Sequence, residues 1–173
     1  MTSTRRSPAP GATRFGDTGT RIRRAIPSDR QGLVAIWLRS VRATHEFLDP
    51  ADVDALLEPS TAYLTSEEPE LWVLADASDA PVGFMGLDGG EVESLFLAPE
   101  VHRRGFGRRL IAHAAELRGE LTVIVNEQNT GAVRFYEACG FVTERRSDTD
   151  GGGRPFPILF MRRPTDGPPE DRD

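Results

Sequence analysis

The sequence of 173 residues contains one cysteine and no lysine, because all 21 of its basic residues are arginine. A single cysteine, Cys139, allows no internal disulfide, which favours a reducing, cytoplasmic location. Three histidines and one cysteine without clustered spacing predict that no metal is bound. No apolar run approaches the length of a membrane span, and the N-terminal residues lack the apolar centre of a secretory signal. We therefore expect no membrane association.

Positive charge is also in deficit. The formal net charge is -6 and the isoelectric point is near 5.2, which argues against a nucleic-acid partner, since that role requires a basic surface. The length and an apolar content of 38% suit a single domain, which we expect over residues 21–163. Residues 1–20 and 164–173 contain almost no large apolar side chains, and the sequence predicts that both are flexible tails.

Between these ends the apolar pattern alternates between strand and helix periods, which predicts a fold of the mixed α/β (α+β) class. A helix is expected after a capping box formed by Ser28 and Gln31, with Leu33, Ile36, Trp37, Ser40, Val41 and Thr44 at helical spacing. Further helices are predicted over 52–64, 108–117 and 130–138. Strands are predicted over 21–26, 71–76, 81–88, 91–97, 121–126, 141–146 and 156–162.

The segment ESLFLAPEVHRRGFGRRLIAH, residues 93–113, places a basic turn with two glycines between a strand and a helix. A helix start leaves amide N–H groups unpaired and carries the positive end of the helix dipole, so it attracts an anion. Gly105 and Gly107 would let the main chain approach that anion, or would allow tight packing of the strand and the helix. Leu110 replaces the third small residue of a dinucleotide-binding fingerprint, and a P-loop is also absent.

This segment, together with NEQNTGAVRFYEACGF at 126–141, resembles the GNAT superfamily of acyl-CoA-dependent N-acetyltransferases. The resemblance covers about residues 20 to 162. The segments IWLRSVRATHEFL, LWVLAD, PVGFM, VNEQN and FYEACGFVTERR are more particularly similar to the bacterial YjaB-type subgroup. It implies a mixed, mostly antiparallel sheet that is splayed between its fourth and fifth strands and flanked by helices, with acetyl-CoA bound in the gap.

The resemblance also implies residues for the cosubstrate. The pantetheine arm would pair with the main chain of the strand around Leu95, Phe96 and Leu97, and Asn129 matches an asparagine that contacts this arm. The pyrophosphate would bind the main chain of the glycine turn, with arginines that raise the local positive potential. The turn comprises His102, Arg103, Arg104, Gly105, Phe106, Gly107 and Arg108. His102 stands where the family usually has glutamine or arginine.

An amine with a pKa near 10.4 is only about one part in 2,500 neutral at pH 7, so a base would assist its attack on the acetyl group. Glu91 and Glu93 lie two residues apart on one strand and point to the same face, and either is a candidate for that base. Tyr136 matches the tyrosine that acts in the family as general acid toward the departing thiolate. The alternative for Tyr136 is that of a core aromatic residue.

The acceptor would be a primary amine of a small molecule or of a protein. By the resemblance, the first two helices form a wall of its pocket, so that His45, Glu46 and Phe47 would contact it, although His45 also completes an apolar helix face with Trp37 and Val41. Acidic residues in this region favour a cationic acceptor. We expect a monomer or a homodimer. The alternative function is a catalytically silent acyl-CoA-binding or sensing module.

Overall fold

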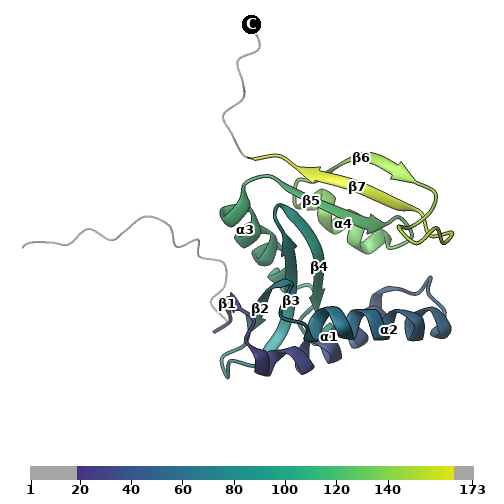
Figure 1. Ribbon diagram of the computed structural model, residues 1–173. Coiled ribbons are helices and arrows are strands. Elements are labelled where there is room, and N and C mark those ends of the chain that lie inside the picture. The colour runs from purple at the N-terminus through teal and green to yellow at the C-terminus, as the bar shows by residue number, and fades with distance from the viewer. Residues whose placement is uncertain (1–18, 166–173) are drawn as a thin grey trace, which may run out of the picture.

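The computed structural model describes residues 19–165, so most of the predicted tails at 1–20 and 164–173 lies outside the described residues. Helices and strands follow one another in an order close to the predicted one (Figure 1). The strands are β1 (Arg21–Arg24), β2 (Glu70–Ala75), β3 (Pro81–Asp88), β4 (Glu91–Leu97), β5 (Leu121–Asn126), β6 (Val142–Ser147) and β7 (Ile158–Arg163). The helices are α1 (Arg30–Thr44), α2 (Pro50–Thr65), α3 (Phe106–Arg118) and α4 (Thr130–Ala138), with the 3-10 turns η1 (Pro27–Asp29) and η2 (Pro99–Val101).

The strands form one sheet in the order β1-β2-β3-β4-β5-β7-β6. All neighbours are antiparallel except β4 and β5, which run parallel. The register between β4 and β5 covers only the pairs Glu91↔Thr122 and Val92↔Val123. Beyond these pairs the two strands diverge, and we call this diverging region the splay. The expected mixed, mostly antiparallel sheet is confirmed.

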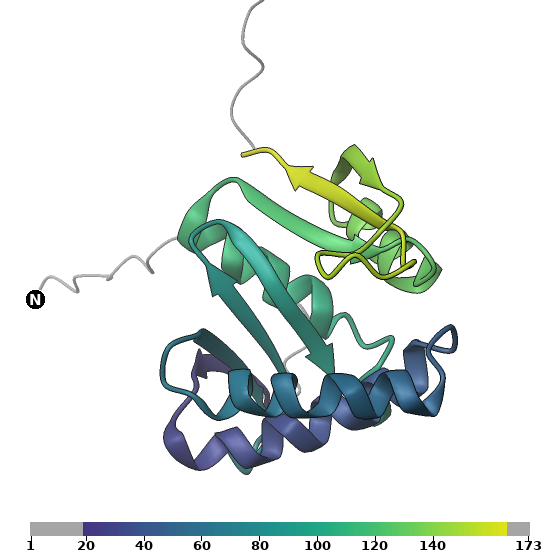
Figure 2. The same cartoon turned by 45° about the vertical axis from the view of Figure 1, so that its right-hand side comes forward.

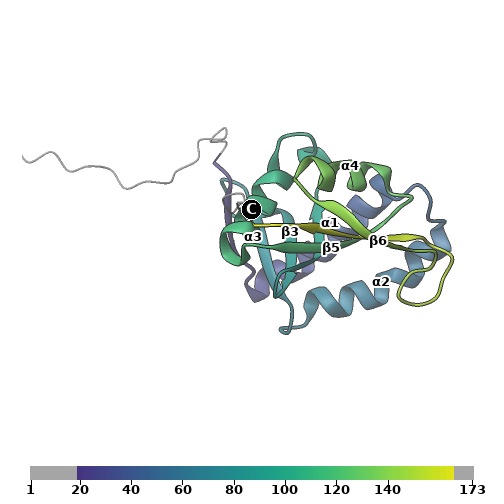
Figure 3. The same ribbon diagram turned by 90° about the horizontal axis from the view of Figure 1, so that it is seen from above.

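The two halves of the sheet turn away from each other (Figure 2). In the first half, the helix pair α1 and α2 covers one face of β3 and β4, and α3 packs on the opposite face. The two faces can be distinguished at β4, where Ser94 lies beside Tyr63 of α2 and Leu97 lies beside Gly107 of α3. Seen from above, α4 and α2 lie on opposite sides of β5, β6 and β7 (Figure 3).

The core follows the predicted apolar pattern. Of the six residues expected on the inner face of the first helix, all are buried except Thr44, which is exposed at the last turn. Phe84 and Met85 of β3 and Leu110 of α3 are fully buried between the layers. Within residues 19–165, no helix has the length and apolar character that crossing a membrane requires.

The starts of three helices differ from the prediction. The capping box of Ser28 and Gln31 is wrong, because η1 precedes α1 and Asp29 takes over the local hydrogen bonding. The Asp29 side chain accepts the Ile26 N–H at 2.8 Å and two hydrogen bonds from the Arg23 guanidinium, at 2.6 and 3.0 Å. The second helix begins at Pro50, because Asp49 and Asp52 form a capping box there. The third begins at Phe106, two residues before the predicted start.

Candidate active site

The turn before α3 has the geometry of an anion site. Arg103 and Gly105 both have positive φ angles, 59° and 80°, and this conformation lets the chain reverse into the helix. The first intrahelical hydrogen bond runs from the Arg109 N–H to the Gly105 carbonyl, so the preceding amides at the helix start have no helical acceptor. Oriented N–H groups at the positive end of a helix form a donor set that suits a pyrophosphate.

The two glycines of the turn serve different purposes. Gly105 is exposed, and a Cβ at this position would meet nothing within 4 Å, so its positive φ is what requires glycine. Gly107 is buried, and a Cβ there would lie 2.9 Å from the Phe135 ring and 3.8 Å from a Leu97 methyl group. Gly107 therefore permits the close approach of α3 to α4 and β4, which is the packing alternative that the sequence left open.

The basic residues around the turn do not behave alike. Arg103, Arg104 and Arg108 are exposed, and the Arg104 guanidinium lies 5.2 Å from the centre of the Phe106 ring. Arg109 instead donates to the side chain and the carbonyl of Thr20, which fixes the start of β1. Three arginines of the turn thus remain at the surface, where their positive charge can act on an anion.

The strand β4 supplies a main-chain edge at the splay. Leu95, Phe96 and Leu97 pair with β3, but within residues 19–165 no strand pairs with them on the β5 side. His102 is joined to this edge, because its Nε2–H donates to the Leu97 carbonyl at 3.0 Å. The side chain of His102, which stands where the family usually has glutamine or arginine, therefore links the turn to β4. Among residues 19–165 no strand pairs with this edge, which has the form that an extended amide chain would need, although His102 occupies the Leu97 carbonyl.

Helix α4 forms the other side of the splay. Asn129 caps this helix through its side-chain oxygen, which accepts the Ala132 N–H at 3.1 Å. Tyr136 is only 7% exposed and packs edge-on against Phe135 and Phe141. Burial raises the pKa of the Tyr136 hydroxyl well above its ordinary value, so the hydroxyl keeps its proton at neutral pH. It forms no hydrogen bond with any residue that the structure describes.

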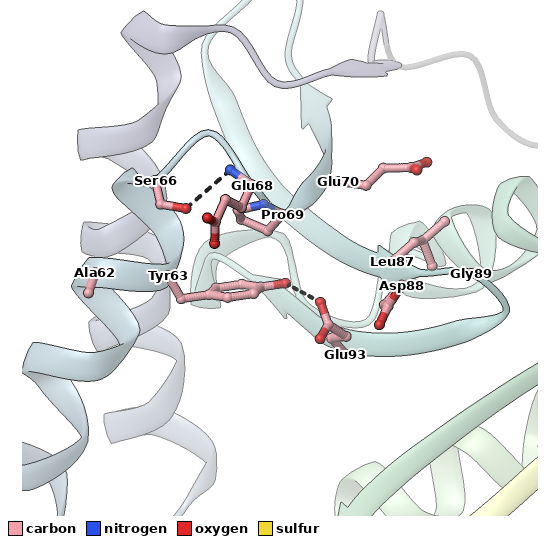
Figure 4. Close-up of a pocket in the computed structure, with 10 residues that line it drawn as sticks. All are labelled: Ala62, Tyr63, Ser66, Glu68, Pro69, Glu70, Leu87, Asp88, Gly89 and Glu93. Atoms are coloured by element: carbon pink, nitrogen blue, oxygen red, sulfur yellow. Dashed lines mark hydrogen bonds between the residues drawn. The ribbon is translucent and has the colours of Figure 1, made fainter.

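A β-bulge in β4 shapes the face opposite α3. Gly86 of β3 pairs with Ser94 and Leu87 pairs with Val92, so Glu93 is an extra residue without a partner in β3. The carboxylate of Glu93 accepts a hydrogen bond from the Tyr63 hydroxyl of α2 at 2.9 Å (Figure 4). Burial raises the pKa of Tyr63 to about 12. Tyr63 is thus a protonated donor at neutral pH.

Glu93 lies on the wall of a pocket of about 820 Å³ between α2 and the ends of β2, β3 and β4 (Figure 4). We call it the acidic pocket. Its charged and hydroxyl-bearing lining residues are Tyr63, Ser66, Glu68, Glu70, Asp88 and Glu93. Glu70 is compensated by ion pairs with Arg24 and Arg118. Among residues 19–165 no arginine lines the pocket, so its remaining carboxylates give it a negative potential.

The second candidate base, Glu91, lies at the start of β4, where it pairs with Asp88 and Thr122. It is half-buried, and it is not among the residues that line the acidic pocket. Of the two glutamates that the sequence left as alternatives, only Glu93 therefore combines an exposed carboxylate, a hydrogen-bonded partner and a place on the pocket wall.

The predicted acceptor residues lie between α1 and α2. His45 and Glu46 line a second pocket of about 320 Å³, and Phe47 lies near Phe156 of the β6–β7 loop, with their ring centres 6.3 Å apart. His45 Nδ1 is 2.8 Å from the Thr44 hydroxyl. Its Nε2 is 3.4 Å from the Asn129 amide nitrogen. His45 thus contacts the far side of the splay and does more than complete the α1 stripe.

The ring nitrogens of His45 have defined roles. The Thr44 hydroxyl donates its own hydrogen to the Ser40 carbonyl, so its oxygen accepts a hydrogen bond from His45 Nδ1–H. The other nitrogen, Nε2, is then free to accept from the Asn129 amide. Burial lowers the pKa of His45, which agrees with this neutral tautomer.

Sequence reasoning missed Tyr63, Ser94 and the acidic residues beside them. The chain has only two tyrosines, and both lie at the candidate site, on opposite sides of β4. That scarcity was the one signal in the sequence. The contact of Tyr63 with Glu93 joins residues 30 positions apart. It depends on how α2 crosses β4, and no local sequence pattern predicts that crossing.

Residues 67–143 match the model of the acetyltransferase (GNAT) domain family. The chain is 45% identical over 143 residues to the peptidyl-lysine N-acetyltransferase YjaB of Salmonella typhimurium (strain LT2), a match that covers 83% of this chain and 97% of that relative. The solution structure of apo-form YjaB from Escherichia coli matches with a TM-score of 0.78 at 43% identity, over 83% of this chain and 96% of that one. The PaiA N-acetyltransferase of Thermoplasma acidophilum, solved in complex with coenzyme A, shares the fold, with a TM-score of 0.70 at 21% identity over 84% of this chain and 98% of that one.

The sheet that splays between β4 and β5 belongs to the fold that this chain shares with these N-acetyltransferases. An identity of 45% over most of both chains is enough to assign the chain to the family of this relative. The chain belongs to the GNAT family of N-acetyltransferases, as the resemblance implied.

Proposed function

We propose that the protein transfers the acetyl group of acetyl-CoA to the side-chain amine of lysine residues in other proteins. The observation that carries this proposal is the acidic pocket beside Glu93, because a pocket lined by carboxylates, and by no arginine of residues 19–165, favours a cationic ammonium group. The relatives named as peptidyl-lysine N-acetyltransferases support the same acceptor. The chain itself contains no lysine, so its own side chains would not compete with the substrate.

The donor would bind in the splay. The amides at the start of α3, from Arg103 to Arg108, would hold its pyrophosphate, with Arg103, Arg104 and Arg108 near its phosphates. The main chain of Leu95–Leu97 would pair with the pantetheine amides on the edge that β5 leaves free. Asn129 would contact the same arm from the side of α4. The thioester would then lie between Glu93 on one side of β4 and Tyr136 on the other.

The reaction would be a direct attack. The acceptor ammonium gives up one proton to the Glu93 carboxylate, directly or through water, and the neutral nitrogen attacks the thioester carbonyl carbon. A C–N bond forms, and the C–S bond breaks as the carbonyl is restored. The departing thiolate takes the proton of the Tyr136 hydroxyl. The nitrogen loses its second proton to solvent, and solvent returns a proton to Tyr136. A peptide backbone N–H near Leu95 would polarise the carbonyl oxygen.

We place this reaction in the bacterial cytoplasm, because the curated relatives are bacterial proteins and Cys139 is a free thiol. The proposal is tested by initial rates of thiol release from acetyl-CoA with three acceptors: a peptide with one lysine and a blocked N-terminus, the same peptide with arginine in place of lysine, and spermidine. Release that requires the lysine peptide supports the proposal. Release only with spermidine would redirect it to small amines, and no release above hydrolysis with any acceptor would contradict transfer to amines.

A further inference from the structure

We propose that Tyr63 is a positioning residue for the reaction. It would hold the Glu93 carboxylate in the orientation that receives the proton of the incoming amine. This inference rests on the proposed function, because it takes Glu93 as the base. Tyr63 belongs to α2, and neither the match with the family model, which begins at residue 67, nor the residues that carry the family resemblance include it.

The contact of the two side chains has a clear direction. The Tyr63 hydroxyl donates to Glu93 Oε2 at 2.9 Å, and the raised pKa of Tyr63 keeps this donor protonated throughout the neutral range. The side chain of Glu93 is exposed and forms no other hydrogen bond within residues 19–165. Its second oxygen, Oε1, is therefore free to accept a proton, while Oε2 is held. Figure 4 shows the Tyr63 ring extending from α2 to this carboxylate.

The place of the Tyr63 hydroxyl is shaped by a glycine in β3. A Cβ built on Gly86 would lie 2.2 Å from the Tyr63 hydroxyl oxygen and 2.6 Å from the Ser94 hydroxyl oxygen. Gly86 is also the partner of Ser94 at the bulge that sets Glu93 outside the regular pairing. The bulge and the glycine thus create one space, and the hydroxyl that contacts Glu93 fills it. Any larger residue at position 86 would displace that hydroxyl.

A base on an exposed, flexible side chain spends most of its time in unproductive rotamers. Holding a glutamate in one rotamer ahead of the reaction is worth about tenfold in rate, because the side-chain entropy is then lost before the reaction begins. Tyr63 has only two side-chain torsions and a half-buried ring, so it can provide this order at little further cost. The effect should appear in kcat with the acceptor and not in the binding of acetyl-CoA.

The test is a double-mutant cycle with Tyr63→Phe and Glu93→Gln, measured as kcat and as KM for each substrate. We expect Tyr63→Phe to lower kcat about tenfold, to leave KM for acetyl-CoA unchanged, and to cause no further loss in the Glu93→Gln background. An equal loss in both backgrounds would overturn the inference, because Tyr63 would then act on the substrate or on the fold independently of Glu93. An unchanged kcat in the wild-type background would overturn it as well.

Failure of the proposed function gives a different pattern. If Glu93→Gln retains the full rate, Glu93 is not the base, whatever Tyr63→Phe does. Gly86→Ala serves as a second route to the same displacement. It should lower kcat as Tyr63→Phe does, and the melting temperature is measured in parallel because the new Cβ would also press on the Ser94 hydroxyl. Gly32→Ala is the matched control, because a Cβ at exposed Gly32 meets nothing within 4 Å. A full rate for Gly86→Ala would contradict the positioning role.

Discussion

Replacing Tyr136 by phenylalanine removes one hydroxyl from the α4 side of the splay and should leave the fold intact. The ring is held by Phe135 and Phe141, whose ring centres lie 5.1 and 5.3 Å away, and these contacts do not involve the hydroxyl. Since the hydroxyl has no hydrogen-bond partner among the described residues, its removal leaves no buried group unsatisfied. The free energy of unfolding should therefore change by less than about 1 kcal/mol.

The effect on catalysis should be much larger. General acid catalysis by a placed side chain contributes roughly 10² to 10⁴ in rate. The leaving group is a thiolate, and an ordinary thiol has a pKa of about 8.5, so the need for a proton is modest. We therefore expect the lower end, a loss of about 100-fold in kcat, which corresponds to roughly 2.7 kcal/mol of transition-state stabilisation.

The assay is thiol release from acetyl-CoA at saturating lysine peptide, with the affinity for CoA and the melting temperature measured in parallel. A large loss in kcat with unchanged CoA affinity and melting temperature would support the role of general acid. An unchanged kcat, or a loss seen only in CoA affinity, would refute it and leave Tyr136 as a packed aromatic residue.

Three further predictions follow from other parts of the structure. Gly107→Ala should lower the free energy of unfolding by about 1 to 3 kcal/mol, because its Cβ would press on the Phe135 ring. Gly32→Ala in α1 should instead raise the free energy of unfolding by about 0.5 to 1 kcal/mol. Urea unfolding should show changes of opposite sign for the two variants, and changes of the same sign would contradict the packing of Gly107 against Phe135. The His113 ring packs against Trp72, its Nε2 is buried without a hydrogen-bond partner among the described residues, and burial lowers its pKa. As the pH is lowered, the unfolded chain therefore binds a proton at His113 before the folded chain does, so the free energy of unfolding falls below pH 6.5, by at most about 1.4 kcal/mol per pH unit. Urea unfolding at pH 7 and pH 5 should show a smaller fall in the free energy of unfolding for His113→Leu than for the wild type. An identical fall in the two proteins would refute this role of His113. Replacing Arg103, Arg104 and Arg108 together by alanine should weaken CoA binding about tenfold at low salt and less at high salt, as calorimetry would measure; a loss independent of salt would show that their charge is not what binds.

Much of the fold could be predicted because its determinants are local. The apolar face of α1 was visible from residue spacing, and Leu33, Ile36 and Trp37 are buried as that spacing requires. The start of the same helix was not predictable, because it depends on the pairing of Asp29 with Arg23 in β1. A capping pattern in the sequence competes with such tertiary contacts, and here the buried ion pair determines the start.

The residues of the candidate donor site could be named from the sequence and stay a prediction, whereas much less of the candidate acceptor site could be named. The glycine turn and Tyr136 are motifs with fixed spacing, so the resemblance carried them directly. Strict alternation would place Glu93 and Ser94 on opposite faces of β4, but the bulge at Glu93 places both on the face that α2 covers. No pattern in the sequence predicts this bulge. The acidic pocket combines residues of α2, β2, β3 and β4, so it appears only when these elements are assembled.

In the proposed reaction the thioester of acetyl-CoA lies in the splay, with Tyr136 on one side of β4 and Glu93 on the other. A crystal structure of the complex with CoA tests it most directly. We expect the pyrophosphate on the amides of 103–108, the pantetheine along Leu95–Leu97, and the sulfur within about 3.5 Å of the Tyr136 hydroxyl. A sulfur that lies away from Tyr136, or a CoA molecule bound outside the splay, would rule out this placement of the thioester.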